Sequence, residues 1–148
     1  MSLRRRRPGL VYPVNEDWHY VGDTGEPAFE TWWANATSDR NLAFRIREAG
    51  TVDVHGYIEN TNAPAQPSAA LFTLPADYWP SADTFQGSCV VYVAGGTTNG
   101  YTSVPVDVDS AGTVALAAVG MTDQFGSGAY ILYAWVHGQF FLTPASAP

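Results

Sequence analysis

The part of this chain that decides its fold is the stretch YILYAWVHGQFFL, which spans residues 130–142. Aromatic and aliphatic residues dominate it and no proline interrupts it, so it predicts a β-strand, the longest of the chain. Successive side chains of a strand point to opposite faces of the sheet. One face of this strand would carry Ile131, Tyr133, Trp135, His137, Gln139 and Phe141, and the other would carry Tyr130, Leu132, Ala134, Val136, Gly138 and Phe140.

Both faces of this strand are largely apolar, whereas an ordinary antiparallel strand keeps one face in water. One face is expected to meet the core of the domain. The other either meets a neighbouring subunit or lies under long loops of the same chain, and the sequence favours the two arrangements equally. The candidate residues for contact with a neighbouring subunit are Tyr133, Trp135, His137 and Phe141.

Short strands separated by turns are predicted for the chain before this stretch. Glycine, proline, asparagine and aspartate mark the turns, and valine, threonine and aromatic residues fill the segments between them. Pro105 has no backbone N–H to donate, so its strand is expected towards an edge of the sheet. The predicted strands are residues 43–47, 51–58, 70–74, 88–94, 101–108 and 113–119, and the main turns and loops are residues 48–50, 60–68, 95–100, 109–112 and 120–128. This spacing predicts an all-β fold, a jelly-roll-like antiparallel β-sandwich.

Residues 1–17 are predicted to form an extended arm, and residues 18–148 a single β-sandwich domain. The arm carries four consecutive arginines, Arg4, Arg5, Arg6 and Arg7. They repel one another, and the prolines that follow disfavour regular structure. In a free monomer the arm would be a solvated tail, and in an assembly it would anchor the domain to an acidic partner surface or to nucleic acid. Arginine suits such an anchor because its guanidinium group pairs with carboxylate or phosphate through two hydrogen bonds.

Size and charge limit the possible functions. A chain of 148 residues suits one domain with a substantial core. Its net charge is −7, it contains no lysine, and beyond the run of four arginines three further arginines face fourteen acidic residues. An acidic body repels polyanions, so nucleic acid is not expected as its partner. No signal peptide or membrane-spanning stretch is recognisable, which predicts a protein made in the cytoplasm without cleavage and without a membrane partner.

The sequence contains no recognisable motif for catalysis, metal binding or a cofactor. His19, His55 and His137 are far apart and fit no metal-ligand spacing, so each is interpreted as a surface or packing residue. The acidic residues allow many carboxylate pairs, but none stands out as a catalytic acid and base. Cys89, the single cysteine, lies in an apolar run and is predicted to be a buried, inert thiol. The chain is therefore predicted to be no enzyme, with no catalytic residues, no metal site and no cofactor.

Carbohydrate binding without hydrolysis is compatible with the residue types. Sugar sites combine flat aromatic faces with Asn, Asp and Gln, although most large aromatic residues belong to cores or interfaces. Loops at residues 60–68, 95–101 and 120–128 are the segments expected to meet a ligand. The candidate ligand residues are Trp79, Asn99 and Tyr101.

Five segments of the chain follow one another in a recognisable order. They are GEPAF at residues 25–29 followed by Trp32 or Trp33, an alternating strand that runs from Phe44 to Gly56, FTLPADYWP at residues 72–80, a hairpin over residues 106–114, and the aromatic stretch at residues 130–141. In this order, over residues 18–142, the chain resembles small β-rich structural proteins of tailed bacteriophages, namely minor tail proteins and tail-fibre or receptor-binding modules. Asp77 and Trp79 stand where that family usually has Gly and Arg, so no local role of this corner is carried over.

The resemblance implies a jelly-roll head similar to that of tumour necrosis factor, assembled as a homotrimer on a virion. The protein would then be a non-enzymatic virion component, a minor tail protein that its arm attaches to other virion proteins and whose distal loops face the host surface. The same fold also suits a capsid decoration or head-fibre protein, or a receptor module that binds host cell-wall glycan. The expected partners are copies of the chain, other virion proteins and, for a receptor module, that glycan.

Overall fold

The structure is a computed structural model that describes residues 16–47, 50–80, 84–117 and 121–141, without the side chains of residues 84–86, 140 and 141. Arg4 to Arg7 of the predicted arm lie outside the described residues. The strands are β1 (His19–Tyr20), β2 (Trp33–Asn35), β3 (Ala43–Ile46), β4 (Thr51–Asn60), β5 (Ala70–Thr73), β6 (Thr84–Ala94), β7 (Gly100–Val108), β8 (Thr113–Leu116) and β9 (Tyr130–Phe141), and the short helices are η3 (Ala76–Tyr78) and α1 (Met121–Phe125).

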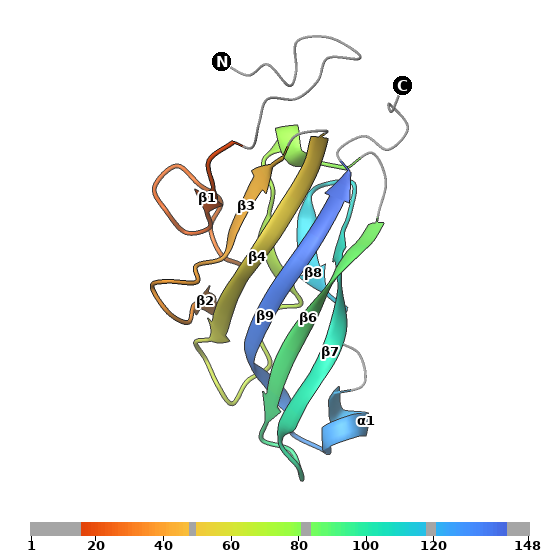
Figure 1. The fold of residues 1–148 in the computed structure, drawn as a ribbon. Coiled ribbons are helices and arrows are strands. Elements are labelled where there is room, and N and C mark those ends of the chain that lie inside the picture. The colour runs from red at the N-terminus through yellow and green to blue at the C-terminus, as the bar shows by residue number, and fades with distance from the viewer. Residues whose placement is uncertain (1–15, 48–49, 81–83, 118–120, 142–148) are drawn as a thin grey trace.

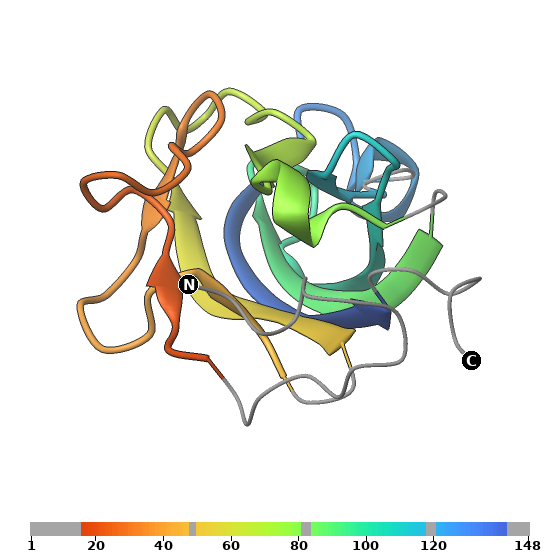
Figure 2. The same cartoon turned by 90° about the horizontal axis from the view of Figure 1, so that it is seen from above.

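The nine strands of the described residues form one antiparallel sheet in the order β1-β3-β4-β9-β6-β7-β8-β5, with β2 paired to the far end of β4. The sheet is strongly curled, so β5 and β8 lie opposite β4, β9 and β6 (Figures 1 and 2). The prediction of an all-β, antiparallel, sandwich-like fold is confirmed. Its two layers are the two halves of a single curled sheet.

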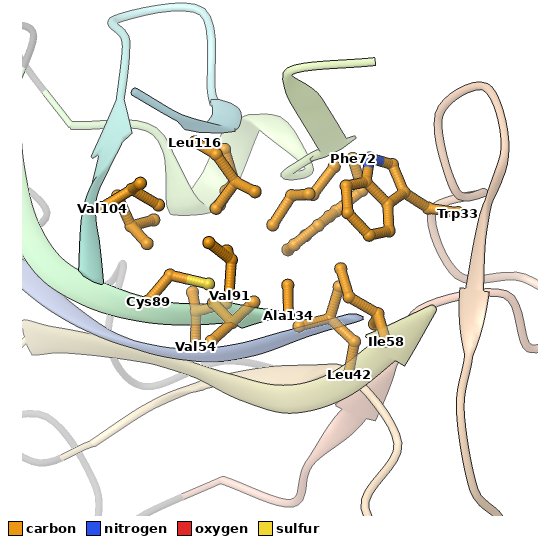
Figure 3. Close-up of a cluster of buried hydrophobic side chains, with 14 of the residues drawn as sticks. Trp33, Leu42, Val54, Ile58, Phe72, Cys89, Val91, Val104, Leu116 and Ala134 are labelled. Atoms are coloured by element: carbon orange, nitrogen blue, oxygen red, sulfur yellow. The ribbon is translucent and has the colours of Figure 1, made fainter. Parts of the chain in front are cut away.

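The hydrophobic core fills the inside of the curl (Figure 3). Val54, Val91 and Ala134 point inward from β4, β6 and β9, and Phe72 and Leu116 meet them from β5 and β8. The core forms on this face because aliphatic residues alternate with polar or aromatic ones along β4 and β6. Burying each such aliphatic side chain contributes about 1.5–3 kcal/mol relative to leaving it in water.

Gly56 in the middle of β4 allows the preceding connection to approach the sheet closely. A Cβ atom at this position would overlap the backbone of Leu42, which lies immediately before β3. The backbone also bonds across this contact, because the Tyr57 N–H donates to the Arg40 carbonyl at 2.8 Å. Residues 39–42 are thereby held against β4, and Asp39 and Arg40 border a groove on the outer surface of the sheet.

Most predicted strands are present, with differences at their ends. β3 and β4, which correspond to the predicted strands 43–47 and 51–58, pair with each other, and residues 61–68 lie in the predicted loop. β6 begins at Thr84 rather than at residue 88, and β1, β2 and α1 were not predicted. Pro105 lies just before the part of β7 that pairs with β8, so the first part of β7 is an edge among the described strands.

The predicted face assignment of β9 is wrong at its beginning. Ile131 is buried in the core with Ala134 and Val136, although strict alternation placed it with Tyr133 and Trp135. The pairing of β9 with β6 shifts register between Tyr133 and Ile131, so one extra residue of β9 is accommodated there. Such a β-bulge moves the preceding side chains to the opposite face.

The body of the molecule begins earlier than the predicted boundary at residue 18. Glu16 accepts hydrogen bonds through Oε2 from the Ile46 N–H at 2.8 Å and from the Tyr78 hydroxyl at 2.8 Å. Its own N–H donates to the Ile46 carbonyl at 3.1 Å. Glu16, assigned to the arm on sequence grounds, is therefore fixed to β3 and η3.

Candidate functional site

Five aromatic side chains lie together on the convex side of the sheet, and we call them the outer aromatic face. They come from four neighbouring strands, β4, β9, β6 and β7, and the outward-facing Val90 lies among them. The members of the outer aromatic face are Tyr57, Tyr92, Tyr101, Tyr133 and Trp135.

Strand register explains why these residues meet. One row across the sheet runs from Glu59 through Tyr133 and Tyr92 to Tyr101, and the next row runs from Tyr57 through Trp135 and Val90 to Ser103. Directly opposed side chains in an antiparallel sheet are about 4.5–5.5 Å apart at Cβ, close enough for the rings to pack.

The rings form a continuous set of contacts. Tyr57 stacks on Trp135 with centroids 4.5 Å apart and planes inclined by 15°. The Tyr101 ring meets the Tyr92 ring edge-on, with centroids 4.9 Å apart, and its centroid lies 5.8 Å from that of Trp135. Tyr133 lies 5.6 Å from Tyr57. Aromatic pairs of this kind contribute about 0.5–1.5 kcal/mol beyond area burial, so the face is ordered by its own contacts.

Part of this surface remains open to solvent in the single chain. Tyr101 is 64% exposed and Val90 is 42% exposed, and no described loop covers either of them. Burial against its neighbours raises the pKa of Tyr57, and the nearby Tyr133 and Tyr101 raise it further. An exposed apolar patch with a polar surround is typical of an interaction surface rather than of an ordinary monomer surface.

A groove of about 500 Å³ lies at one side of the outer aromatic face. Its apolar wall is formed by Tyr57, Val90 and Trp135, and its polar lining includes Arg40 and Ser88. Asp39, His55 and His137 also border it. This size lies within the range of sites that accept a small molecule or a protruding side chain.

A smaller groove of about 310 Å³ adjoins the first, and His55 and His137 line both. Trp18 packs edge-on against the His55 ring at 4.2 Å. The pKa of His55 is lowered, chiefly by partial burial and then by His137, while Asp53 opposes the shift and Arg45 adds to it. The neutral imidazole is therefore favoured at this position.

The predicted subunit-contact residues have different outcomes. Tyr133 and Trp135 lie on the outer aromatic face, and His137 is exposed on the same face one row further along. The side chain of Phe141 lies outside the described residues. Sequence reasoning missed Tyr57 and Tyr92. Their places in the sequence could have revealed them, because each lies on the face of its predicted strand that is opposite to the buried aliphatic residues.

The predicted ligand residues do not form one site. Tyr101 is in β7 rather than in a loop, and Asn99 precedes it in the β6–β7 connection. Trp79 lies at the other end of β7, against Gly112 in the β7–β8 turn, and donates from Nε1 to the Leu74 carbonyl at 2.7 Å. Strands rise about 3.3 Å per residue, so roughly 20–25 Å of β7 separates the two ends. Of the two tryptophans that follow the GEPAF segment, Trp33 is buried and donates from Nε1 to the Ser68 carbonyl, whereas Trp32 is 41% exposed.

A polar cluster that sequence spacing did not predict surrounds His19. Its Nδ1 lies 2.8 Å from the Glu26 carboxylate, and its Nε2 lies 3.1 Å from the Tyr78 hydroxyl and 3.7 Å from Glu16. A carboxylate, an imidazole and a hydroxyl in series can relay a proton. Tyr78 is only 4% exposed and neither groove reaches it, so this cluster holds residues 16–26 against the curl rather than presenting a nucleophile.

Other chemistry is limited in the part of the chain that the structure describes. No group of three or more His, Cys, Asp or Glu side chains there is placed to hold a metal ion. Cys89 is fully buried, and burial raises the pKa of its thiol to about 12. None of the described helices has the length and apolar character needed to cross a membrane.

Comparisons of this chain with protein-family models, with curated proteins and with solved structures gave no match.

Proposed function

We propose that this chain is a non-enzymatic structural protein of a tailed-bacteriophage virion, a homotrimeric minor tail protein attached through its N-terminal arm. The observation that carries the self-assembly part of the proposal is the outer aromatic face, which a single chain leaves open at Tyr101 and Val90. The resemblance of the ordered sequence segments to tail proteins supports the virion part. The host surface is the proposed contact of the distal loops.

Copies of the same chain suit the outer aromatic face better than a charged partner does. Its two rows contain one charged residue among the described positions, Glu59 at the β4 end. Tyrosine and tryptophan are enriched at the buried centres of interfaces, where charged residues are depleted. In a cyclic trimer each copy presents one flank of such a face to the opposite flank of the next copy, so the ring closes without leaving a free patch.

The test is the molar mass of the full-length protein in solution, measured by light scattering during size-exclusion chromatography. We expect a trimer for the natural chain and a monomer for Tyr101→Glu, because the new carboxylate would have to be desolvated within the interface. Tyr20→Glu is the matched control, since Tyr20 is 40% exposed on β1, away from this face, and should leave the trimer intact. A monomeric natural protein at micromolar concentration, or a trimeric Tyr101→Glu variant, would contradict the proposal.

The virion assignment has a separate test. Antibodies against the protein should label the tail tip in electron micrographs of particles. Label on the capsid would favour the capsid decoration or head-fibre alternative of the same fold, and absence of the protein from purified particles would refute both.

Glycan binding is the second candidate function, and the groove beside Trp135 supports it. The groove combines aromatic walls with Arg40, Ser88 and the two histidines, which provides both ring surfaces and hydrogen-bonding groups. A glycan array probed with the purified protein tests this candidate. Binding to host wall polysaccharide that Trp135→Ala removes would support it, and no signal on such polysaccharide would reject it.

A further inference from the structure

The fold brings together two histidines that lie far apart in the sequence. His55 of β4 and His137 of β9 are direct partners in the antiparallel register, and both are exposed on the convex face. Directly opposed residues on one face are nearest neighbours across the two strands. We call these residues the histidine pair.

The ring nitrogens of the histidine pair are uncommitted. No described residue makes a hydrogen bond to the imidazole of His55 or His137, whereas both ring nitrogens of His19 face polar partners, Glu26 and Tyr78. The histidine pair also lies between the two grooves, so there is room on both sides of it for water or an ion.

The side chains of the histidine pair have the chemistry that transition-metal ions bind. Neutral imidazole is a common ligand of zinc, copper and nickel ions. The edge of Trp18 packs on His55 and restricts the orientation of the ring.

We propose that the histidine pair is a binding site for one divalent transition-metal ion of the zinc, nickel and copper class. His55 and His137 supply two nitrogen ligands, and water fills the remaining coordination positions. Imidazole ligands favour these ions over magnesium and calcium, which prefer oxygen. Both ligands come from one chain, so the site does not depend on the proposed trimer.

A carboxylate that lines the smaller groove beside the pair is already engaged. Asp53 lies two residues before His55 on the same face, where it accepts a hydrogen bond from Gln139 Nε2 at 3.0 Å and lies 3.5 Å from Arg47 Nε. Oδ1 of Asp53 is engaged by Gln139 and Oδ2 by Arg47. The two imidazoles are therefore the ligands on which the test concentrates.

The experiment is a titration of the full-length protein with NiCl₂ at pH 7.5, followed by tryptophan fluorescence and by calorimetry. Trp18 contacts His55, and Trp135 lies on the same face of β9 as His137, so bound Ni²⁺ should quench their emission. We expect saturable binding of one ion per chain. Because loss of even an outer-shell partner weakens metal binding about 10–100-fold, His55→Gln and His137→Gln should each weaken it at least tenfold.

Ser88→Ala is the matched control for these variants. Ser88 is exposed beside His137 in the same row of the sheet, and its hydroxyl is not needed as a ligand, so this variant should bind Ni²⁺ like the natural chain. The affinity should also fall as the pH is lowered from about 7.5 to about 5.5, since protonated imidazole does not bind metal. Circular dichroism verifies that each variant is folded.

The proposal is overturned if no saturable binding occurs, or if both histidine variants bind as tightly as the natural chain, which would indicate an adventitious ion only. Molar mass is recorded on the same samples. A trimer that does not bind Ni²⁺ would refute the metal site alone, and a monomer that binds it through the histidine pair would refute the proposed assembly alone.

Discussion

Cys89 illustrates how one position is determined by the face of the strand on which it lies. Its side chain points from β6 into the hydrophobic core, whereas the side chain of the neighbouring Val90 points outward and lies on the outer aromatic face. Burial disfavours the charged thiolate and raises the pKa of the thiol to about 12. Because the thiolate is the nucleophile, burial keeps this cysteine in its unreactive thiol form at neutral pH.

The titration of Cys89 has a consequence for stability at high pH. The folded state holds the thiol proton more tightly than the unfolded chain, in which the thiol has its ordinary pKa of 9.0. The stability that this tighter proton binding contributes is therefore fully present below about pH 9 and is lost as the pH rises towards about 12. Urea unfolding at pH 7.5 and pH 10.5 should show that the natural chain loses about 2 kcal/mol more than Cys89→Ala, which cannot titrate. Equal losses in the two proteins would mean that the thiol ionises freely in the folded state.

At the scale of elements, the pairing of β6 with β9 holds the curled sheet together. Gly87 and Gly138 are partners in this pairing, and their backbones approach closely. A Cβ atom at Gly87 would collide with the Gly138 Cα and the His137 carbonyl oxygen. A Cβ atom at Gly138 would lie 3.9 Å from the Gly87 Cα, its nearest neighbour among the described residues. The two glycines of one pair are therefore under different constraints.

Alanine substitutions should reveal this difference. Gly87→Ala should destabilise the protein by about 2–3 kcal/mol, because the clash involves backbone atoms that can move only if the two strands separate. Gly138→Ala should change the stability by less than about 1 kcal/mol. Chemical denaturation of both variants measures the difference, and similar losses for the two would show that the close approach is not asymmetric.

For the whole molecule, charge separates the two predicted parts of the chain. The net charge is −7, although the four consecutive arginines lie within the first seven residues, so the remainder is strongly acidic. An arginine-rich segment can pair with carboxylate or phosphate on a partner, while an acidic head does not compete for that partner. The attachment to the body starts at Glu16, which bonds to β3 and η3.

Removal of residues 1–15 should therefore separate attachment from assembly. We expect the truncated protein to keep the oligomeric state and the thermal stability of the full chain, but to be missing from particles assembled in its presence. A full-length variant with Arg4 to Arg7 replaced by glutamine should behave like the truncation. Immunoblotting of purified particles measures incorporation, and a truncated protein found at normal levels on particles would contradict the role of the arm.

The candidate site could be predicted only in part. Tyr133, Trp135 and His137 were recognised because they alternate along one apolar strand. The sequence did not reveal that Tyr57, Tyr92 and His55 belong to the same surface, because their proximity depends on which strands pair and in what register. The grouping of Trp79 with Asn99 and Tyr101 was wrong for the same reason, since nearly the whole length of β7 separates Trp79 from the other two residues.

The sequence by itself determined the all-β class and most of the strands, because these features depend on local alternation and on turn residues. Only the tertiary structure decided that the strands form one curled sheet with β9 at its centre, and that a bulge turns Ile131 inward. It also decided that four strands assemble the outer aromatic face and that His55 faces His137. These features depend on pairing between segments distant in the chain, and that pairing is selected by the packing of the whole core rather than by any local pattern.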